Sequence, residues 1–217
     1  MLLVVTATEL EMRPLRQALA GTPGWMPLVA GVGLLETAVR LSRFLSENQV
    51  KLLGMVNCGV AGAYVGAGPG LLDLCLAERE TMADFGVGLE AGVEDFDPPL
   101  APVSFSLDGP LLARAFAIFT RRGMRFWRGN FVSVQTASGQ EGQGERLRQR
   151  HRAICENMEG AAVARVAAEF GLPCLELRAV SNLVRNRDLG GWRLDEAAAA
   201  CAQAAAVLLP ELSRGDD

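Results

Sequence analysis

The 217-residue sequence has little of several residue types that active sites commonly use. His151 is the only histidine, which excludes a histidine-rich metal site and most Ser-His triads. Lys51 is the only lysine and lies outside any glycine-rich loop, so a Walker-type phosphate loop is excluded as well. Proton transfer in any reaction catalysed by this chain therefore falls to carboxylates and amides.

The sequence also lacks a basic excess and a long hydrophobic run. The formal net charge is -4, so the chain has no basic excess of the kind that binds nucleic-acid phosphates. The longest apolar stretch, from Ala197 to Leu209, contains Gln203 and is too short to span a bilayer. The apolar start, Met1 to Val5, is too short and too poor in basic flanks for a signal peptide. We expect a cytoplasmic protein that binds neither nucleic acid nor membrane.

The five cysteines are odd in number and show no CxxC spacing. They lie mostly in apolar stretches, which is typical of reduced core thiols rather than of a disulfide framework. No linker or shift in composition divides the chain, so we expect a single domain over residues 1–217.

Short apolar strands alternate with helical periodicity along the chain. We expect strands at Leu2–Val5, Leu52–Asn57, Leu71–Ala77, Phe131–Val134 and Cys174–Val180, and helices at Glu9–Ala20, Glu159–Phe170 and Ala197–Leu209. Gly171 and Pro173 mark the end of the second of these helices. The pattern predicts an α/β fold of three layers, α/β/α, with a central mixed, largely parallel twisted sheet.

Two segments are predicted to be irregular. Residues 84–102 are rich in acidic residues, Gly and Pro, and residues 138–144 are rich in Gly and Gln. Either segment is a candidate lip over a pocket. The arginines at positions 146, 148, 150 and 152 are spaced to spread around a helix rather than to form one patch.

The glycine-rich motifs do not match a dinucleotide fingerprint. Gly31-Val32-Gly33 precedes a predicted helix, but Glu36 replaces the third glycine of that fingerprint. The segment Asn57 to Gly62 follows a predicted strand and would let the backbone approach a small ligand. An ordinary tight turn explains the same residues equally well.

Two glutamates are candidates for chemistry, and each has a structural alternative. Glu11 completes a capping box with Thr8, as Glu9 does with Thr6, so either glutamate is explained by capping of the first helix. Glu159 stands at a predicted helix start, where its negative charge would interact favourably with the helix dipole; this is its structural alternative.

Several of these motifs together resemble one family. The segment Ala7 to Met12 resembles the first-strand exit of methylthioadenosine/S-adenosylhomocysteine nucleosidases, and Asn57 to Gly62 resembles their N-T-G-S-A-G turn. Asn157-Met158-Glu159 resembles their E-M-E ribose motif. The segment Arg178 to Asn182 resembles the strand end that faces the base. The resemblance covers nearly the whole chain in order and implies a purine nucleoside phosphorylase-like fold.

Two departures from the general nucleosidases favour a particular branch. Asn182 stands where those enzymes carry Asp, and the segment 184–188 with Trp192 resembles the futalosine hydrolase branch, whose substrate is a hypoxanthine nucleoside. Val60 replaces the serine of the N-T-G-S-A-G turn and removes a hydroxyl that phosphorylases use near phosphate. The resemblance therefore implies hydrolysis rather than phosphorolysis, although a phosphorylase, a methylthioadenosine-type nucleosidase and a non-catalytic nucleoside-binding protein stay open.

The resemblance also implies roles for individual residues. It makes Glu11 the base that activates water, and it makes Glu159 and Met158 the ribose contacts. Asn182 would face the leaving base, since an amide can donate to O6 or N7 of a 6-oxopurine; a simple turn residue is the alternative. The implied catalytic residues are Glu11 and Asn182, and the implied substrate-binding residues are Glu159, Met158, Val32, Gly62 and Thr136. No metal and no cofactor are implied, and the family implies a homo-oligomer. Arg187, or another arginine near the pocket, is the candidate partner for the substrate's carboxylate tail.

Overall fold

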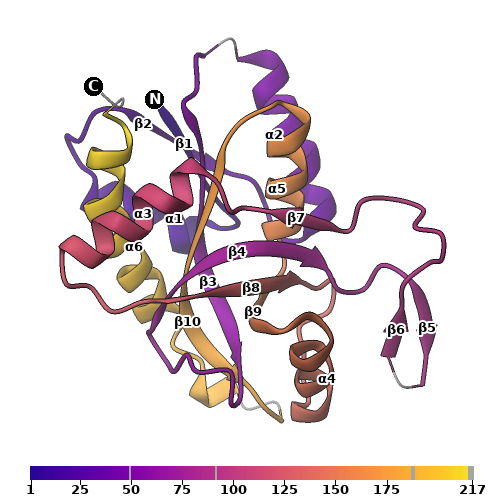
Figure 1. Ribbon diagram of the computed structural model, residues 1–217. Helices are drawn as coiled ribbons and strands as arrows, with labels where there is room; N and C mark the ends of the chain where they lie inside the picture. Colours follow the sequence, from indigo (N-terminus) through magenta and orange to yellow (C-terminus); the bar gives the residue numbers. More distant parts are fainter. Residues whose placement is uncertain (49, 91, 187–188, 215–217) are drawn as a thin grey trace.

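The computed structural model describes residues 1–48, 50–90, 92–186 and 189–214. A central sheet carries helices on both faces (Figure 1). The strands of this sheet are β1 (Leu2–Thr6), β2 (Trp25–Val29), β3 (Gly54–Tyr64), β4 (Leu74–Met82), β7 (Ser104–Ser106), β8 (Trp127–Ser133), β9 (Ala153–Asn157) and β10 (Cys174–Val184). The helices are α1 (Glu9–Ala18), α2 (Leu34–Glu47), α3 (Pro110–Arg121), α4 (Glu141–His151), α5 (Gly160–Glu169) and α6 (Leu194–Leu212), with a 3-10 turn at Leu189–Gly191.

Strand β1 shows why the sheet is covered on both sides. Its residues are all buried, and alternate side chains point to opposite faces of a strand. Leu2 and Val4 pack into the core formed with α1, α3 and α6, whereas Leu3 and Val5 pack against α2 and α5. A strand buried on both faces is typical of parallel sheets flanked by helices.

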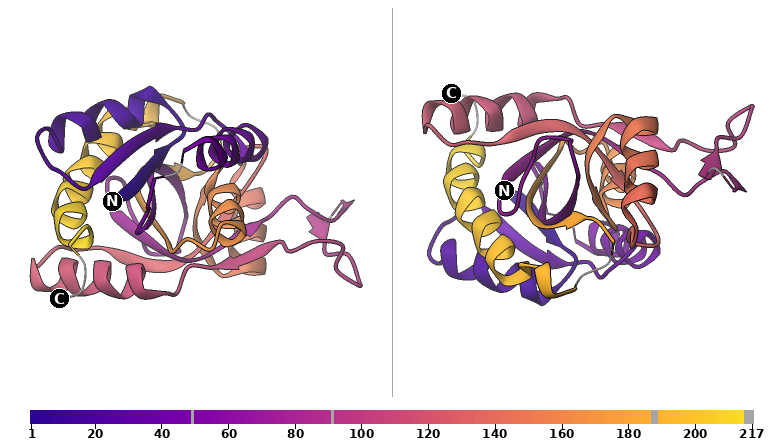
Figure 2. Two further views of the ribbon diagram at one scale, coloured as in Figure 1. Left: turned by 90° about the horizontal axis from the view of Figure 1, so that it is seen from above. Right: turned by 90° about the horizontal axis from the view of Figure 1, so that it is seen from below.

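The sheet is mixed and largely parallel, as predicted. Parallel pairs join β1 to β2, β1 to β3, β3 to β10, β4 to β8 and β8 to β9. Antiparallel pairs join β4 to β10, β3 to β9 and β4 to β7. Since β10 pairs with both β3 and β4, the strands β3, β10, β4, β8 and β9 close into a ring, which is visible along the view of Figure 2.

Two predicted boundaries at the sheet edge were wrong. The segment Asn57 to Gly62 is not a turn after a strand but lies inside β3, and Asn182 lies inside β10 rather than beyond it. The physical reason is the long β3–β10 ladder, which runs from Met55 paired with Cys174 to Tyr64 paired with Val184. Backbone pairing along this ladder outweighs the turn tendency of the glycines.

The start of α5 differs from the sequence prediction, whereas its end agrees with it. Glu159 is the N-cap of α5 rather than its first residue, since α5 begins only at Gly160 and the preceding strand β9 runs to Asn157. The predicted C-terminal end of α5 is confirmed, because Phe170 is its C-cap and Gly171 adopts a positive φ of 64°.

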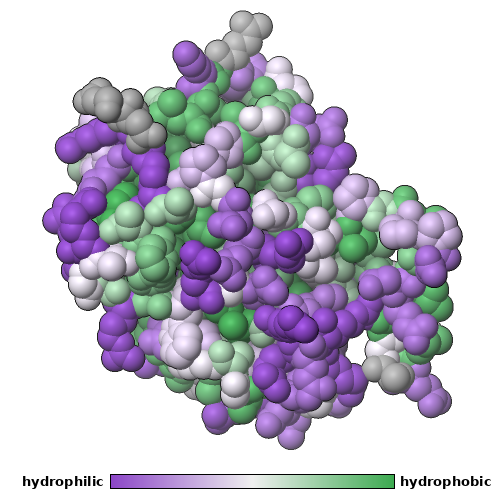
Figure 3. Space-filling model, viewed as in Figure 1, coloured by the Kyte–Doolittle hydropathy of each residue, from purple (hydrophilic) through white to green (hydrophobic). Residues whose placement is uncertain are grey.

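The two segments predicted to be irregular contain regular structure. Residues 84–102 hold β5 (Val87–Leu89) and β6 (Gly92–Glu94), a hairpin that projects from the body of the molecule in Figure 1. Helix α4 begins at Glu141, within the second segment. Its arginines spread as expected: Arg148 pairs with Glu145 and Arg150 with Asp95. Figure 3 shows hydrophilic side chains gathered over the region of α4.

The cysteines are unpaired, as predicted, and four of the five are buried. None of the helices in the described ranges combines the length and the apolarity that a membrane crossing requires.

Candidate active site

A cavity of about 330 Å³ opens where β3, β9 and β10 meet the N-terminal ends of α1 and α5. Six of the seven residues predicted for the site border it: Glu11, Val32, Gly62, Met158, Glu159 and Asn182. Thr136, the seventh, is exposed and is not among the residues that border the cavity. The fold therefore gathers residues from positions 11 to 182 of the chain around one space.

Glu11 caps the first helix and also borders the cavity, so it fits both of the interpretations that the sequence allowed. Its carboxylate completes a capping box, accepting from the Thr8 N–H (3.0 Å) and the Thr8 hydroxyl (2.9 Å). The other oxygen, Oε1, accepts from the N–H of Val60 on β3 (3.1 Å). The side chain is buried and borders the cavity. Capping orients this carboxylate toward the cavity, so the two interpretations are compatible. The alternative box between Thr6 and Glu9 is wrong, because Glu9 pairs with Arg16 (2.6 Å).

Gly59 explains how Glu11 reaches the sheet. A Cβ at this position would lie 2.5 Å from Oε1 of Glu11 and 2.6 Å from Nη1 of Arg178. Any side chain larger than hydrogen would displace one of these charged groups. The glycine is therefore required by close packing of side chains onto the strand rather than by a turn.

Glu159 is the N-cap of α5 and is held from two sides. Its Oε1 accepts from the N–H of Gly33 (3.1 Å), and its Oε2 lies 3.7 Å from Nη1 of Arg178. Burial raises the pKa of Glu159, and the Arg178 charge and the Gly33 N–H act in the opposite direction. Met158, its neighbour, is half-buried and borders the same cavity.

Asn182 is oriented by the preceding residue. The Ser181 hydroxyl lies 2.8 Å from Oδ1 of Asn182 and 3.2 Å from the carbonyl oxygen of Ala61. Since the hydroxyl donates to Oδ1, the Nδ2 group of Asn182 is a donor on the cavity side, close to Gly62. The position suits recognition of an acceptor atom.

Arg178 links these groups, although no role was predicted for it from the sequence. It is 1% exposed and is the only buried basic side chain in the described part of the chain. Its guanidinium contacts Glu176 Oε1 (2.9 Å), the Val60 carbonyl (3.2 Å) and Asn157 Oδ1 (3.4 Å). Burial lowers the pKa of Arg178, but the carboxylates of Glu176, Glu159 and Glu11 outweigh burial and raise it, so the group stays charged. Arg178 is the first residue of the segment Arg178 to Asn182 discussed above, but the spacing of the sequence did not indicate which carboxylates its guanidinium would contact.

A second buried carboxyl pair lies behind the cavity. Glu80 on β4 accepts from Ser133 Oγ (2.9 Å) and from Asn157 Nδ2, and it faces Glu176 across Gly160. Burial and the Glu176 charge raise the pKa of Glu80 well above its ordinary value. Asn157 Oδ1 in turn accepts from the N–H groups of Glu159 and Gly160. This network fixes the start of α5 and so the position of Glu159.

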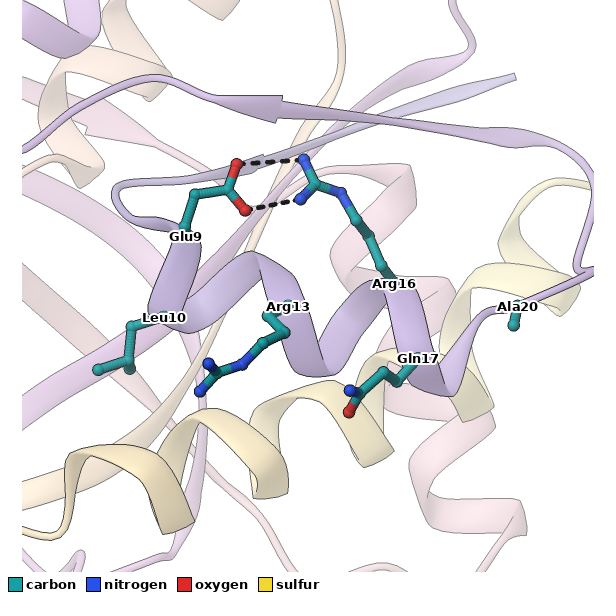
Figure 4. A pocket seen from close by; sticks show the side chains of 6 residues that line it. All are labelled: Glu9, Leu10, Arg13, Arg16, Gln17 and Ala20. Carbon is teal, nitrogen blue, oxygen red and sulfur yellow. Dashed lines mark hydrogen bonds and ion pairs between the residues drawn. The ribbon is translucent and has the colours of Figure 1, made fainter.

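A larger hollow, about 690 Å³, lies on the outer side of α1 (Figure 4). It is bordered by Glu9, Leu10, Arg13, Arg16, Gln17 and Ala20, and the Glu9–Arg16 pair spans its rim. Its charged groups are exposed and ion-paired, so it presents no desolvated group for chemistry.

His151 ends α4 and does not border the cavity. Arg187, predicted as a partner for the substrate tail, lies outside the described residues.

Comparisons with known proteins show the family of this chain. The model of the phosphorylase superfamily matches residues 18–212. A futalosine hydrolase of Streptomyces coelicolor is 36% identical over 199 residues, which cover 87% of this chain and 80% of that protein.

Two solved structures share the fold at low identity. A methylthioadenosine/S-adenosylhomocysteine nucleosidase of Helicobacter pylori matches with a TM-score of 0.83 at 21% identity, over 97% of each chain. A futalosine hydrolase of the same organism matches with a TM-score of 0.83 at 19% identity, also over 97% of each chain. The fold is therefore common to both kinds of enzyme and does not distinguish them. The family model and the sequence identity together place this chain in the phosphorylase superfamily and, within it, in the futalosine hydrolase family.

Proposed function

We propose that this protein hydrolyses the N-ribosidic bond of futalosine, releasing hypoxanthine and dehypoxanthine futalosine in menaquinone biosynthesis. The observation that carries the proposal is the meeting of Glu11, Glu159 and Asn182 around one cavity, in a chain 36% identical to a futalosine hydrolase. Hydrolysis of this bond needs a base for water, a carboxylate near the ribose and a hydrogen-bond donor to the leaving base.

In the proposed reaction Glu11 takes a proton from water while the water oxygen bonds to C1′ of the ribose. The C1′–N9 bond breaks, and its electron pair leaves with the purine. Asn182 Nδ2 donates to N7 or O6 of the departing base, which then takes a proton from solvent. Glu159 accepts from the ribose hydroxyls, and its charge stabilises the positive charge that develops on the sugar. Met158 packs against the ribose as an apolar wall.

Val60 supports hydrolysis over phosphorolysis. It borders the cavity, and its backbone N–H donates to Glu11 while its carbonyl accepts from Arg178. Its apolar side chain offers no hydroxyl to a phosphate ion at this position. Water therefore fits the space beside Glu11 better than phosphate does.

One assay tests the proposal. Purified protein is incubated with futalosine in phosphate-free buffer, and hypoxanthine is measured by chromatography. We expect release without phosphate. Release that depends on phosphate would make the protein a phosphorylase, and cleavage of methylthioadenosine in preference to futalosine would make it a nucleosidase of the other branch. Binding of futalosine without release of hypoxanthine would indicate a non-catalytic nucleoside-binding protein.

We further propose that the protein is cytoplasmic and forms a homo-oligomer; an exposed apolar strip beside the cavity supports the homo-oligomer. Val32, just before α2, is 53% exposed and borders the cavity, and Leu35 and Val39 in α2 are 76% and 56% exposed. Covering this strip with a second copy would bury apolar area next to the substrate. Light scattering should give a mass above 23.1 kDa, and Leu35→Glu should lower it to that of one chain.

A further inference from the structure

Glu156 is a buried carboxylate on the cavity wall that the proposed hydrolysis does not use. It lies near the end of β9, is 5% exposed and borders the cavity together with Asn182. Its Oε1 accepts from the Ser138 N–H (2.8 Å), and its Oε2 accepts from the hydroxyls of Ser138 (2.6 Å) and Tyr64 (3.0 Å). These three donors hold the carboxyl group in one orientation.

Strand register places Glu156 and Asn182 on either side of Gly62. In the β3–β9 ladder Gly62 pairs with Glu156, and in the β3–β10 ladder it pairs with Asn182. Directly paired residues project from the same face of a sheet. A Cβ on Gly62 would lie 3.1 Å from Asn182 Nδ2 and 3.4 Å from Glu156 Cγ. The absence of a side chain on Gly62 lets the Asn182 amide and the Glu156 side chain approach each other closely over strand β3.

The two side chains present one donor and one acceptor to the cavity that they border. Asn182 Oδ1 accepts from Ser181, which leaves Nδ2 as the donor. An ionised carboxylate has about four acceptor positions, and in the described structure three donors fill positions on Glu156. Two of these donors reach Oε2 and one reaches Oε1, so Oε1 keeps an acceptor position.

This pair matches the edge of a 6-oxopurine. Such a base carries an acceptor, O6, next to a donor, N1–H. A 6-aminopurine carries the opposite pair, an amino donor next to the N1 lone pair. A carboxylate repels the N1 lone pair of the 6-aminopurine and accepts from the N1–H of the 6-oxopurine.

We infer that Glu156 is a specificity-determining residue, whose carboxylate accepts from N1–H of a 6-oxopurine while Asn182 donates to O6. The inference rests on the proposed function, since it assigns the base end of the same cavity. Glu156 would then recognise the base together with Asn182. Selection between 6-oxopurines and 6-aminopurines would depend on this donor–acceptor pair on either side of Gly62.

The test compares the binding of hypoxanthine with that of 1-deazahypoxanthine, in which a C–H replaces N1–H. Calorimetric titration of the wild-type protein should show the deaza base binding about ten- to a hundredfold more weakly, as expected for one hydrogen bond to a charged group. In Glu156→Gln the amide oxygen is a neutral acceptor, and the difference should shrink to about tenfold or less. In Glu156→Met, which has no strong acceptor, the difference should vanish.

Tyr64→Phe is the matched control, because it removes one donor to Glu156 and keeps the carboxylate. This variant should retain the wild-type preference for hypoxanthine. Equal loss of preference in Tyr64→Phe and Glu156→Gln would overturn the inference in favour of a packing role. The wild-type comparison needs no variant to fold, and equal binding of the two bases there would also overturn it.

Cleavage of futalosine, measured on the same preparation, separates the two proposals. If the protein cleaves futalosine but binds hypoxanthine and 1-deazahypoxanthine equally, the role inferred for Glu156 is wrong and the proposed hydrolase function still holds. Absence of both cleavage and hypoxanthine binding removes the proposed function, and the inference with it.

Discussion

Nη1 of Arg178 lies 3.7 Å from Oε2 of Glu159, and the two side chains are 1% and 8% exposed. This buried ion pair joins the only buried basic group of the described chain to the carboxylate assigned to the ribose. Arg178 also contacts Glu176 (2.9 Å), so it serves two carboxylates at once. The charge balance of the whole site depends on this residue.

Arg178→Met should lower the free energy of unfolding by about 3–5 kcal/mol, because it leaves buried carboxylates without a counter-ion. Arg178→Lys keeps the charge but not the planar fork, so it should fold and show reduced kcat/KM. Urea unfolding and steady-state kinetics check both variants. Arg165→Met, which breaks an exposed pair with Glu169, should change neither quantity much; a comparable loss there would contradict the special role of Arg178.

Glu11→Gln should abolish turnover while binding of hypoxanthine stays within about tenfold, because the base is removed and little contact area is lost. Glutamine also fits a capping box, so the melting temperature should stay close to that of the wild type. Glu9→Gln, in the same turn but exposed, is the control. Retained turnover in Glu11→Gln together with a lowered melting temperature would reduce Glu11 to a helix cap.

Glu159→Gln should lower kcat strongly, because a neutral amide no longer stabilises the cationic sugar. The amide oxygen still accepts from Gly33 N–H, so the helix start should be retained. Kinetics with futalosine check the effect, with Glu169→Gln at the exposed end of α5 as control. Normal turnover in Glu159→Gln would remove the ribose assignment.

Asn182→Asp should reduce the rate with futalosine and raise the relative activity toward its 6-amino counterpart. A carboxylate repels O6 but accepts from an amino group. The ratio of the two kcat/KM values should shift by about 1–2 kcal/mol, as expected for one altered hydrogen bond. Equal losses on both substrates would indicate that Asn182 only shapes the strand end.

Glu80→Gln should change how stability depends on pH. The pKa of Glu80 is raised in the folded state, so the folded protein retains a proton that the unfolded chain loses above its ordinary value of 4.5. Wild-type stability therefore contains a term that is present below this value and falls as pH rises toward the folded pKa, by at most about 1.4 kcal/mol per pH unit. The variant lacks this term, so its stability relative to the wild type should increase between pH 5 and pH 8.

Urea unfolding at several pH values checks the prediction for Glu80. Glu78→Gln, on the same strand and paired with exposed Arg128, reports the effect of removing a surface carboxyl group. A constant difference between Glu80→Gln and the wild type across this range would mean that Glu80 titrates at its ordinary value.

The fold class and most of the cavity could be predicted from the sequence. Apolar strands with helical segments between them predict a covered, largely parallel sheet, and β1 and α5 bear this out. Strand β2 was not predicted, because Pro27 interrupts its pattern; the strand lies at the edge of the sheet, where proline is tolerated. Thr136 lies exposed after the end of β8 and does not border the cavity, whereas Val134, two residues earlier, is buried and does.

The sequence by itself determined which chemical groups are available: one histidine, one lysine and a set of glutamates and amides in motifs that resemble a nucleosidase. Only the tertiary structure decided which of them meet. Glu156, Gly62 and Asn182 form one row across β9, β3 and β10, and Arg178 reaches Glu159 through the space above Gly59. Strand register is a property of the folded sheet, and a shift of one residue would turn each of these side chains to the other face.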